Sequence, residues 1–163
     1  MLLRLKNKEY LIVDQFRFKC SIGKKGLNLK KREGDYCTPI GVFKIGKVYY
    51  RPDRVRKPIT VLKTEIIKKN TGWCDDPYSK NYNKEIILNK KNRGEKLFRK
   101  NNIYDILIVI EYNTKKIRPF KGSAIFIHLT KNYSPTKGCI ALKKNDLLIL
   151  LKIINKKSKI KIC

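Results

Sequence analysis

The sequence predicts a mainly β fold with one or two short helices. Several short segments alternate apolar and polar residues, and "FRFKCSI" at 16–22 has the two-residue period of a half-buried strand. Other segments, such as "YDILIVIEY" at 104–112, have the composition of buried strands. One region near the C-terminus spaces its leucines as an amphipathic helix does. A length of 163 residues favours one domain, over 1–163.

The first half of the chain is expected to contain short strands and two irregular stretches. The stretch "KKREGDYCTPIG", 30–41, is polar and rich in Gly and Pro, which predicts a loop. Residues 51–83 carry Pro, Gly, Asp and Asn too often for regular structure, and a long irregular segment in a compact domain is usually functional or a lid. The strands expected in this half are 2–6, 9–13, 16–22 and 42–50.

The second half is expected to contain further strands and two helices. "RGEKLFRK", 93–100, predicts a short helix with Leu97 and Phe98 as its apolar contacts. A second helix is expected over 146–155, begun by Asn145 or by the turn before it. Its apolar face contains Leu147, Leu148, Leu151 and Ile154. The expected strands are 104–112, 123–130, 139–142 and a last strand, "KIKIC".

The composition is strongly basic. Forty Lys and Arg against thirteen Asp and Glu give a formal charge of +27, which attracts nucleic acid, an anionic membrane face or acidic envelope polymers. A compositional bias toward Lys explains the same charge without a dedicated partner. No basic segment alternates regularly with aromatic residues, which argues against a specific nucleic-acid site.

Several other classes of protein are also disfavoured. The longest apolar runs are far too short to span a bilayer, and the N-terminus lacks the unbroken apolar segment of a signal peptide. The five cysteines have no C-x-x-C spacing and the chain has one His, so neither a metal site nor a disulfide framework is expected. Most of these cysteines are expected to be small buried residues.

One His and one Cys lie close together in "IFIHLTKNYSPTKGCIAL", 125–142. Cysteine attacks as a thiolate, and a neighbouring His is the usual group that removes its proton. Gly138 precedes Cys139 and would let the backbone N–H approach a developing oxyanion. Strand alternation puts His128 on one face with Ala124 and Phe126. The residues alone leave two interpretations open: a Cys–His dyad, or a structural His followed by a buried Cys.

Two blocks of the sequence resemble the L,D-transpeptidase catalytic domain, the YkuD-like family. "IFIHL…SPTKGCIAL" is similar to its strand His followed by Ser/Thr-x-Gly-Cys, and "KREGDYCTPIGVF" is similar to its Gly-x-x-x-Thr-Pro-x-Gly-x-Phe stretch. The blocks "YRPDRVRKP", "GWCDDPYSKNYN" and "YDILIVIEYN" resemble a bacterial subgroup of the same family. The resemblance implies a β-sandwich or open barrel whose chemistry takes place in the cell envelope or periplasm.

The resemblance further implies that Cys139 attacks the L,D peptide bond before the terminal D-Ala of a peptidoglycan stem peptide. His128 would support the thiolate and pass the proton to the leaving D-Ala, while the N–H groups of Gly138 and Cys139 would hold the oxyanion. A second stem's amine would resolve the thioester, and no cofactor or metal is implied. The alternatives are an L,D-carboxypeptidase that uses water, or a cationic protein that binds wall polymer or nucleic acid without catalysis. The expected partners are stem peptides, with anionic envelope polymers as a further candidate, and the expected state is a monomer.

The chain departs from the family at two positions beside the nucleophile. Lys137 stands where many members have a second His, so His128 must be the base if any His is. Ala141 stands where many members carry an Arg, so another Arg would have to bind stem carboxylates. For Trp73 and Tyr82, in the subgroup block, a wall of the substrate site and a staple between loops are both open. The candidate substrate-binding residues are Arg51, Arg54, Trp73, Tyr82, Thr136 and Lys137.

Overall fold

The structure is a computed structural model that describes residues 1–29 and 31–163. The strands of the described residues are β1 (Leu2–Lys6), β2 (Tyr10–Val13), β3 (Phe16–Ser21), β4 (Leu27–Asn28), β5 (Thr38–Pro39), β6 (Gly41–Tyr50), β7 (Thr64–Ile66), β8 (Thr71–Trp73), β9 (Glu85–Ile87), β10 (Glu95–Lys96), β11 (Ile106–Ile110), β12 (Phe126–Leu129), β13 (Ile140–Leu142) and β14 (Lys159–Ile162). The helix is α1 (Lys144–Ile153). No helix in the described part of the chain has the length and apolar character of a membrane span.

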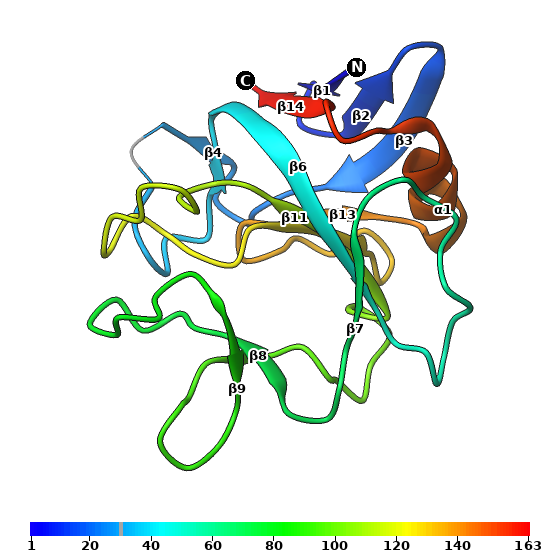
Figure 1. Cartoon of the computed structure of the whole chain (residues 1–163). Helices are drawn as coiled ribbons and strands as arrows, with labels where there is room; N and C mark the ends of the chain where they lie inside the picture. Colours follow the sequence, from blue (N-terminus) through cyan, green and yellow to red (C-terminus); the bar gives the residue numbers. More distant parts are fainter. Residues whose placement is uncertain (30) are drawn as a thin grey trace.

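Eight of the strands close into a barrel. Their order round the ring is β11, β12, β13, β3, β2, β1, β14 and β6, and β6 closes the ring by pairing with β11. β7 is attached to β6, while β8, β9 and β10 form a small separate sheet below the barrel in Figure 1. The first strand pairs with the last, so the two ends of the chain lie side by side at the top of Figure 1. The predicted mainly β fold of barrel type is confirmed.

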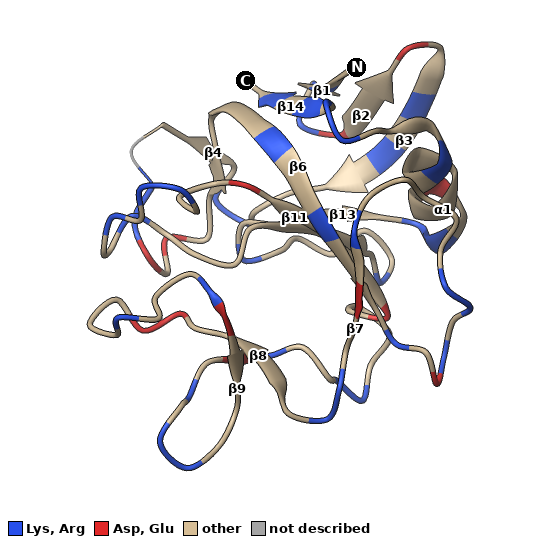
Figure 2. Ribbon diagram, in the orientation of Figure 1, with Lys and Arg blue, Asp and Glu red and all other residues tan. Residues whose placement is uncertain are grey.

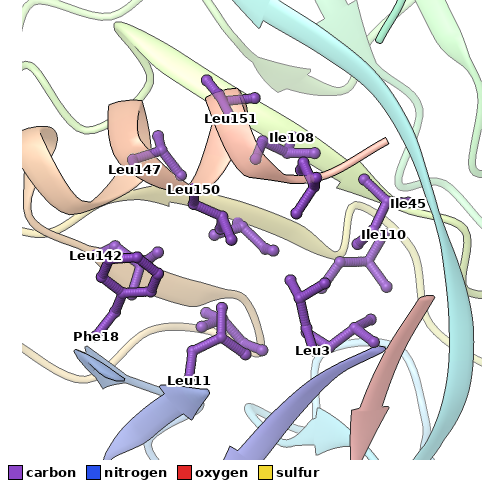
Figure 3. Close-up of a cluster of buried hydrophobic side chains, with 14 of the residues drawn as sticks. Leu3, Leu11, Phe18, Ile45, Ile108, Ile110, Leu142, Leu147, Leu150 and Leu151 are labelled. Atoms are coloured by element: carbon purple, nitrogen blue, oxygen red, sulfur yellow. The ribbon is translucent and has the colours of Figure 1, made fainter. Parts of the chain in front are cut away.

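Aliphatic side chains fill the barrel interior. Each strand of the ring contributes to this cluster, because side chains alternate between the two faces of a strand. α1 adds Leu147, Leu150 and Leu151, which point into the same cluster (Figure 3). Full burial of a side chain of this size contributes about 1.5–3 kcal/mol. The strand residues labelled in Figure 3 are Leu3, Leu11, Phe18, Ile45, Ile108, Ile110 and Leu142.

The strand β11 is buried on both faces. Ile106, Ile108 and Ile110 belong to the interior cluster, whereas Leu107 and Val109 belong to a second cluster on the outer face of the barrel. This explains the unbroken apolar run, since a strand covered on both sides takes apolar residues at every position. The second cluster joins the barrel to the small sheet and to the loops beside it. Its larger members are Tyr49, Trp73, Leu97, Tyr104 and Phe126.

The helix predicted over 93–100 is wrong. Two of these residues form β10, which pairs antiparallel with β8. Leu97 is fully buried, and its N–H donates to the carbonyl oxygen of Thr71 at 3.1 Å. Gly94 packs so closely on Trp73 that an added Cβ would lie 2.4 Å from the Trp73 carbonyl oxygen. Pairing and packing with a distant segment therefore override local helix propensity.

The predicted C-terminal helix is present but has different ends. The residue before it, Lys143, has an extended backbone and makes no side-chain cap, and Asn145 lies inside the first turn. The helix therefore begins before the expected Asn145 cap. Leu150 is buried in place of the expected Leu148, which is only partly buried. The other three apolar positions are buried as predicted.

The remaining elements largely follow the prediction. The predicted strands are present, and most are shorter than expected by a few residues at their ends. The stretch 51–83 is irregular apart from β7 and β8. The predicted loop 30–41 contains the short strand β5, which pairs with β4. The first residue of that loop, Lys30, lies outside the described residues.

Candidate active site

The candidate nucleophile and base come from two neighbouring strands of the barrel. β12 and β13 run parallel, and their register places His128 beside Ala141. Cys139, two residues before Ala141, therefore lies on the same face of the sheet as His128. This is the outer face, because Ile127 and Leu129 point into the barrel. The predicted alternation along 123–130 is confirmed.

A cavity of about 600 Å³ opens at this face, and both His128 and Cys139 line it. Its volume lies within the range of small-molecule sites in proteins. The loop before β13 forms one part of its wall, with Thr136 and Lys137. Charged side chains from other segments contribute much of the rest. They are Lys31, Glu33, Asp75, Glu95, Lys96, Arg99 and Lys131.

Cys139 is held as a neutral thiol. Its side chain is buried, with Sγ donating to the Ala124 carbonyl oxygen at 3.2 Å and accepting the Phe126 N–H at 3.3 Å. Burial, and then the negative charge of Glu95, raise the pKa of Cys139 to about 12. The Phe126 N–H and the cations Lys31 and Arg99 act in the opposite direction. The thiol therefore needs a base before it can attack.

His128 has the tautomer and charge of a base. Its Nδ1 lies 2.8 Å from the carbonyl oxygen of Leu129, and a carbonyl oxygen can only accept, so Nδ1 carries the hydrogen and Nε2 the lone pair. Burial lowers the pKa of His128 to about 4, so the ring is neutral at pH 7. Tyr104 packs edge-on against the ring at 5.2 Å between centroids. Among the described residues, no hydrogen bond joins His128 to Cys139.

The turn before Cys139 is fixed by Thr136 and Gly138. The Thr136 hydroxyl accepts the Gly138 N–H at 3.1 Å and donates to the Cys139 carbonyl oxygen at 2.6 Å. Gly138 has φ +137°, and an added Cβ would lie 2.7 Å from the Cys37 carbonyl oxygen. Only glycine fits this position, and it sets where the nucleophile stands. The N–H expected to hold an oxyanion is bonded to Thr136 in the free protein.

Arg51 and Arg54 do not line the cavity and bind other parts of the chain. Arg51 is buried, holds both oxygens of Asp53 at 2.8 and 2.6 Å, and donates to the Arg99 carbonyl oxygen. Arg54 pairs with Asp105 at 3.0 Å and donates to the carbonyl oxygens of residues 100 and 101. Both guanidinium groups therefore hold the 99–101 loop. Their direct binding of stem carboxylates stays a prediction.

Trp73 and Tyr82 lie behind the cavity wall. Trp73 donates to the Asn83 side chain at 2.9 Å and packs edge-on against Phe126. Tyr82 is buried and its hydroxyl bonds the carboxylate of Glu33, which does line the cavity. These are the contacts of residues that connect loops. A part of either residue in the substrate wall stays a prediction.

The sequence reasoning missed a group of cavity residues around Glu95. This carboxylate accepts hydrogen bonds from the Tyr104 hydroxyl at 2.6 Å and from Arg99 at 2.8 Å, and burial raises its pKa. It also missed Lys31, whose side chain is 3% exposed. No local pattern distinguishes these residues from the many other charges of the chain. No group of three or more His, Cys, Asp or Glu side chains in the described residues is placed to hold a metal ion.

Comparison with known families identifies the family of this chain. The family model of the L,D-transpeptidase catalytic domain matches residues 2–162, which is essentially the whole chain, and the chain belongs to that family. The family acts on peptidoglycan in the cell wall, so an L,D-transpeptidase-type catalytic activity on peptidoglycan is supported. A comparison with curated individual proteins finds no match.

Proposed function

We propose that the protein is a cysteine-dependent L,D-transpeptidase acting on peptidoglycan stem tetrapeptides. It releases D-Ala, keeps the remaining acyl group as a thioester on Cys139, and transfers that group to an amine. The observation that carries the proposal is the presence of His128 and Cys139 on one face of adjacent strands, lining one cavity. Membership of the L,D-transpeptidase family supports the substrate class.

The first half of the reaction forms the thioester. The thiol turns from the Ala124 carbonyl oxygen toward His128, and Nε2 takes its proton as Sγ bonds to the substrate carbonyl carbon. Collapse of the tetrahedral intermediate breaks the C–N bond, and the proton on Nε2 passes to the leaving nitrogen of D-Ala. The bond from Nδ1 to Leu129 keeps the ring oriented through both transfers.

The second half of the reaction transfers the acyl group. The nitrogen of the acceptor amine attacks the thioester carbon and gives a proton to Nε2 of His128. The C–S bond then breaks, and the proton returns to the sulfur of Cys139. In both halves the N–H groups of Gly138 and Cys139 are the proposed donors to the oxyanion. The Gly138 N–H must then leave its bond to Thr136 Oγ1 and donate to the substrate oxygen instead.

The proposed place of action is the cell envelope, where stem peptides are found. Lys137 and Thr136, which line the cavity beside the nucleophile, are the substrate-binding residues best supported by the geometry. Lys and Arg are spread over strands and loops of both the barrel and the small sheet (Figure 2), so an anionic wall polymer would meet positive charge at several places. A free catalytic thiol is consistent with the five cysteines, which form no disulfides with each other.

The experiment is incubation with a disaccharide-tetrapeptide, followed by mass spectrometry of the products. We expect cross-linked dimers with the wild type and none with Cys139→Ala or His128→Ala. Cys74→Ala is the matched control, because Cys74 is also buried but does not line the cavity. Tripeptide alone would identify an L,D-carboxypeptidase with water as the acceptor. A wild type that behaves like Cys139→Ala in every product would refute an enzymatic function and favour the cationic binding protein.

A further inference from the structure

A lysine is buried beside the candidate nucleophile. The side chain of Lys31 is 3% exposed and lines the cavity that contains Cys139. Lysine is almost never fully buried unless it is paired, because its charge loses its hydration. Its partner is Asp35, whose carboxylate oxygen lies 2.7 Å from Nζ. This places a positive charge inside the cavity wall, whereas most other described lysines of the chain are exposed to solvent.

Packing holds the Lys31 ammonium against the turn that carries the nucleophile. An added Cβ on Gly122 would lie 2.9–3.1 Å from the methylene carbons of Lys31, so this glycine makes room for the lysine stem. An added Cβ on Gly138 would lie 3.5 Å from Nζ. The ammonium therefore lies beside the residue immediately before Cys139. The stem is confined and its charged end is directed to the Gly138–Cys139 turn.

The counterion of Lys31 is not part of the cavity lining. Asp35 does not line the cavity, and it also accepts the backbone N–H groups of Arg32 and Cys37 at 2.8 and 2.9 Å. Its charge is therefore shared with the loop. An ammonium has three donors, and Asp35 is the one hydrogen-bond acceptor that the described residues provide for Lys31. Donor capacity therefore remains on the ammonium of this cavity-lining residue.

Lys31 and Arg99 are the two cations that lower the pKa of Cys139, and Arg99 does not supply the same effect as Lys31. Arg99 lines the cavity too, but it is bonded at 2.8 Å to Glu95, which lines the cavity itself and opposes the thiolate. The pair therefore brings both signs of charge to Cys139. His128 is neutral at pH 7. The Gly138 N–H is bonded to the Thr136 hydroxyl. Of the two cations Lys31 and Arg99, Lys31 is the one whose counterion lies outside the cavity lining.

We propose that the ammonium group of Lys31 stabilises the negative charge that develops on the sulfur of Cys139 and on the substrate oxygen during acyl transfer. This inference rests on the proposed function for the substrate oxygen, but the effect on the sulfur is independent of any substrate. Preorganised charge in a site with little water is worth more than the same charge in solvent. Lys31 thereby adds a positive charge to the Gly138 and Cys139 N–H groups that are the proposed oxyanion donors.

The test is the rate at which iodoacetamide alkylates Cys139, measured as a function of pH by mass spectrometry of the Cys139 peptide. Peptide resolution is needed because the chain has five cysteines. We expect Cys139 of Lys31→Met to be alkylated about tenfold more slowly than Cys139 of the wild type at each pH below the thiol pKa. A tenfold change in rate corresponds to a rise of one unit in the pKa of the thiol. Lys31→Arg keeps the charge and should stay within about threefold of wild type. Lys47→Met, which removes a charge outside the cavity lining, should have no effect.

Asp35→Asn separates charge from loop structure. It removes the counterion and leaves the ammonium, so alkylation should stay equal to wild type or become faster. If Lys31 only holds the loop through Asp35, both Lys31→Met and Asp35→Asn will slow alkylation alike, and the proposal is refuted. Equal rates for Lys31→Met and wild type would also refute it. Melting curves of each variant check folding, and Lys31→Gln, which keeps part of the stem and a donor, replaces Lys31→Met if that variant does not fold.

Alkylation uses no peptidoglycan, so the two proposals fail separately. If the wild type cross-links stem peptides but Lys31→Met is alkylated as fast as the wild type, the proposed enzymatic function is supported and the proposed role of Lys31 is wrong. If Lys31→Met alkylates slowly but no stem peptide is converted, the charge effect stands and the proposed function is wrong.

Discussion

Acidification should destabilise the protein in part through His128, whose ring is buried and neutral. Burial lowers its pKa from the ordinary 6.5 to about 4 in the folded chain. Between these two values the unfolded chain binds a proton that the folded chain does not, so the free energy of unfolding falls as the pH falls through this window. Above about pH 6.5 and below about pH 4 the contribution of His128 to the slope is absent. The shift of about two and a half units, at about 1.4 kcal/mol per unit, gives a total loss of about 3 kcal/mol.

The perturbation that isolates this effect is His128→Gln. Denaturant unfolding of wild type and variant from pH 4 to pH 7 gives two curves, and their difference should change by about 3 kcal/mol across that range. Other titrating groups cancel in the difference. A lower stability of the variant at all pH values does not affect the test, since only the change with pH counts.

A second readout uses the fact that the chain has one histidine. Its imidazole signals in a proton NMR titration belong to His128 without assignment, and their midpoint should lie near pH 4. A midpoint near 6.5, with parallel unfolding curves, would refute the argument that the ring is buried and neutral. The same low pKa implies that His128 stays neutral, and can act as a base, down to about pH 5, so the acylation rate should persist to that pH. If the active form were instead an imidazolium–thiolate pair, the rate should fall at higher pH, where His128 loses its proton.

Three further predictions concern backbone space, the turn and the core. Gly138→Ala should lower the free energy of unfolding by about 3 kcal/mol or more, because the added Cβ would lie 2.7 Å from a carbonyl oxygen. Gly34→Ala should lower it by only about 1 kcal/mol, because Gly34 has φ +72° but nothing within 4 Å of the added Cβ. Equal losses for the two variants would contradict the close contact at Gly138. Thr136→Val should slow acylation by about tenfold or more because the hydroxyl that bonds Gly138 is lost, and Thr136→Ser should restore the rate in single-turnover kinetics. Leu150→Ala should cost about 2–5 kcal/mol in denaturant unfolding, and the exposed Ile149→Ala of the same helix well under half of that; similar values would argue against the barrel core.

The sequence predicted the parts of the molecule whose structure is set by nearby residues. The period of two along 123–130 placed His128 on one face with Ala124 and Phe126, and the structure has the same arrangement. The barrel interior covers one side of this strand, and the second cluster covers the other. The Gly138–Cys139 pair predicted a turn at the start of a strand. In the structure Gly138 has a positive φ, which glycine adopts readily. Hydrophobic patterning also predicted α1 and most strands.

What the sequence did not predict depends on distant contacts. "RGEKLFRK" has the composition of a helix, but Leu97 is buried only because a small sheet is built on the outer face of the barrel. Lys31 is one of forty basic residues, and its burial follows from the space above Gly122, far away in sequence. Arg51 was a candidate carboxylate binder, and in the structure it bonds both oxygens of Asp53 two residues later and the carbonyl oxygen of the distant Arg99. Such pairings are decided by the fold and leave no local period to detect.

The closure of the barrel also requires a pairing between its first and last strands. Residues of β1, at Leu2–Arg4, pair with residues of β14, at Lys159–Lys161, so this closure joins the most distant parts of the described chain. Contacts of such high sequence separation form slowly, because the long connecting chain must be ordered first. During synthesis the ring cannot close until β14 has left the ribosome. The β12–β13 face that carries His128 and Cys139 is therefore supported by a complete barrel only once β14 has been made, so the candidate site is among the last parts of the described chain to be completed.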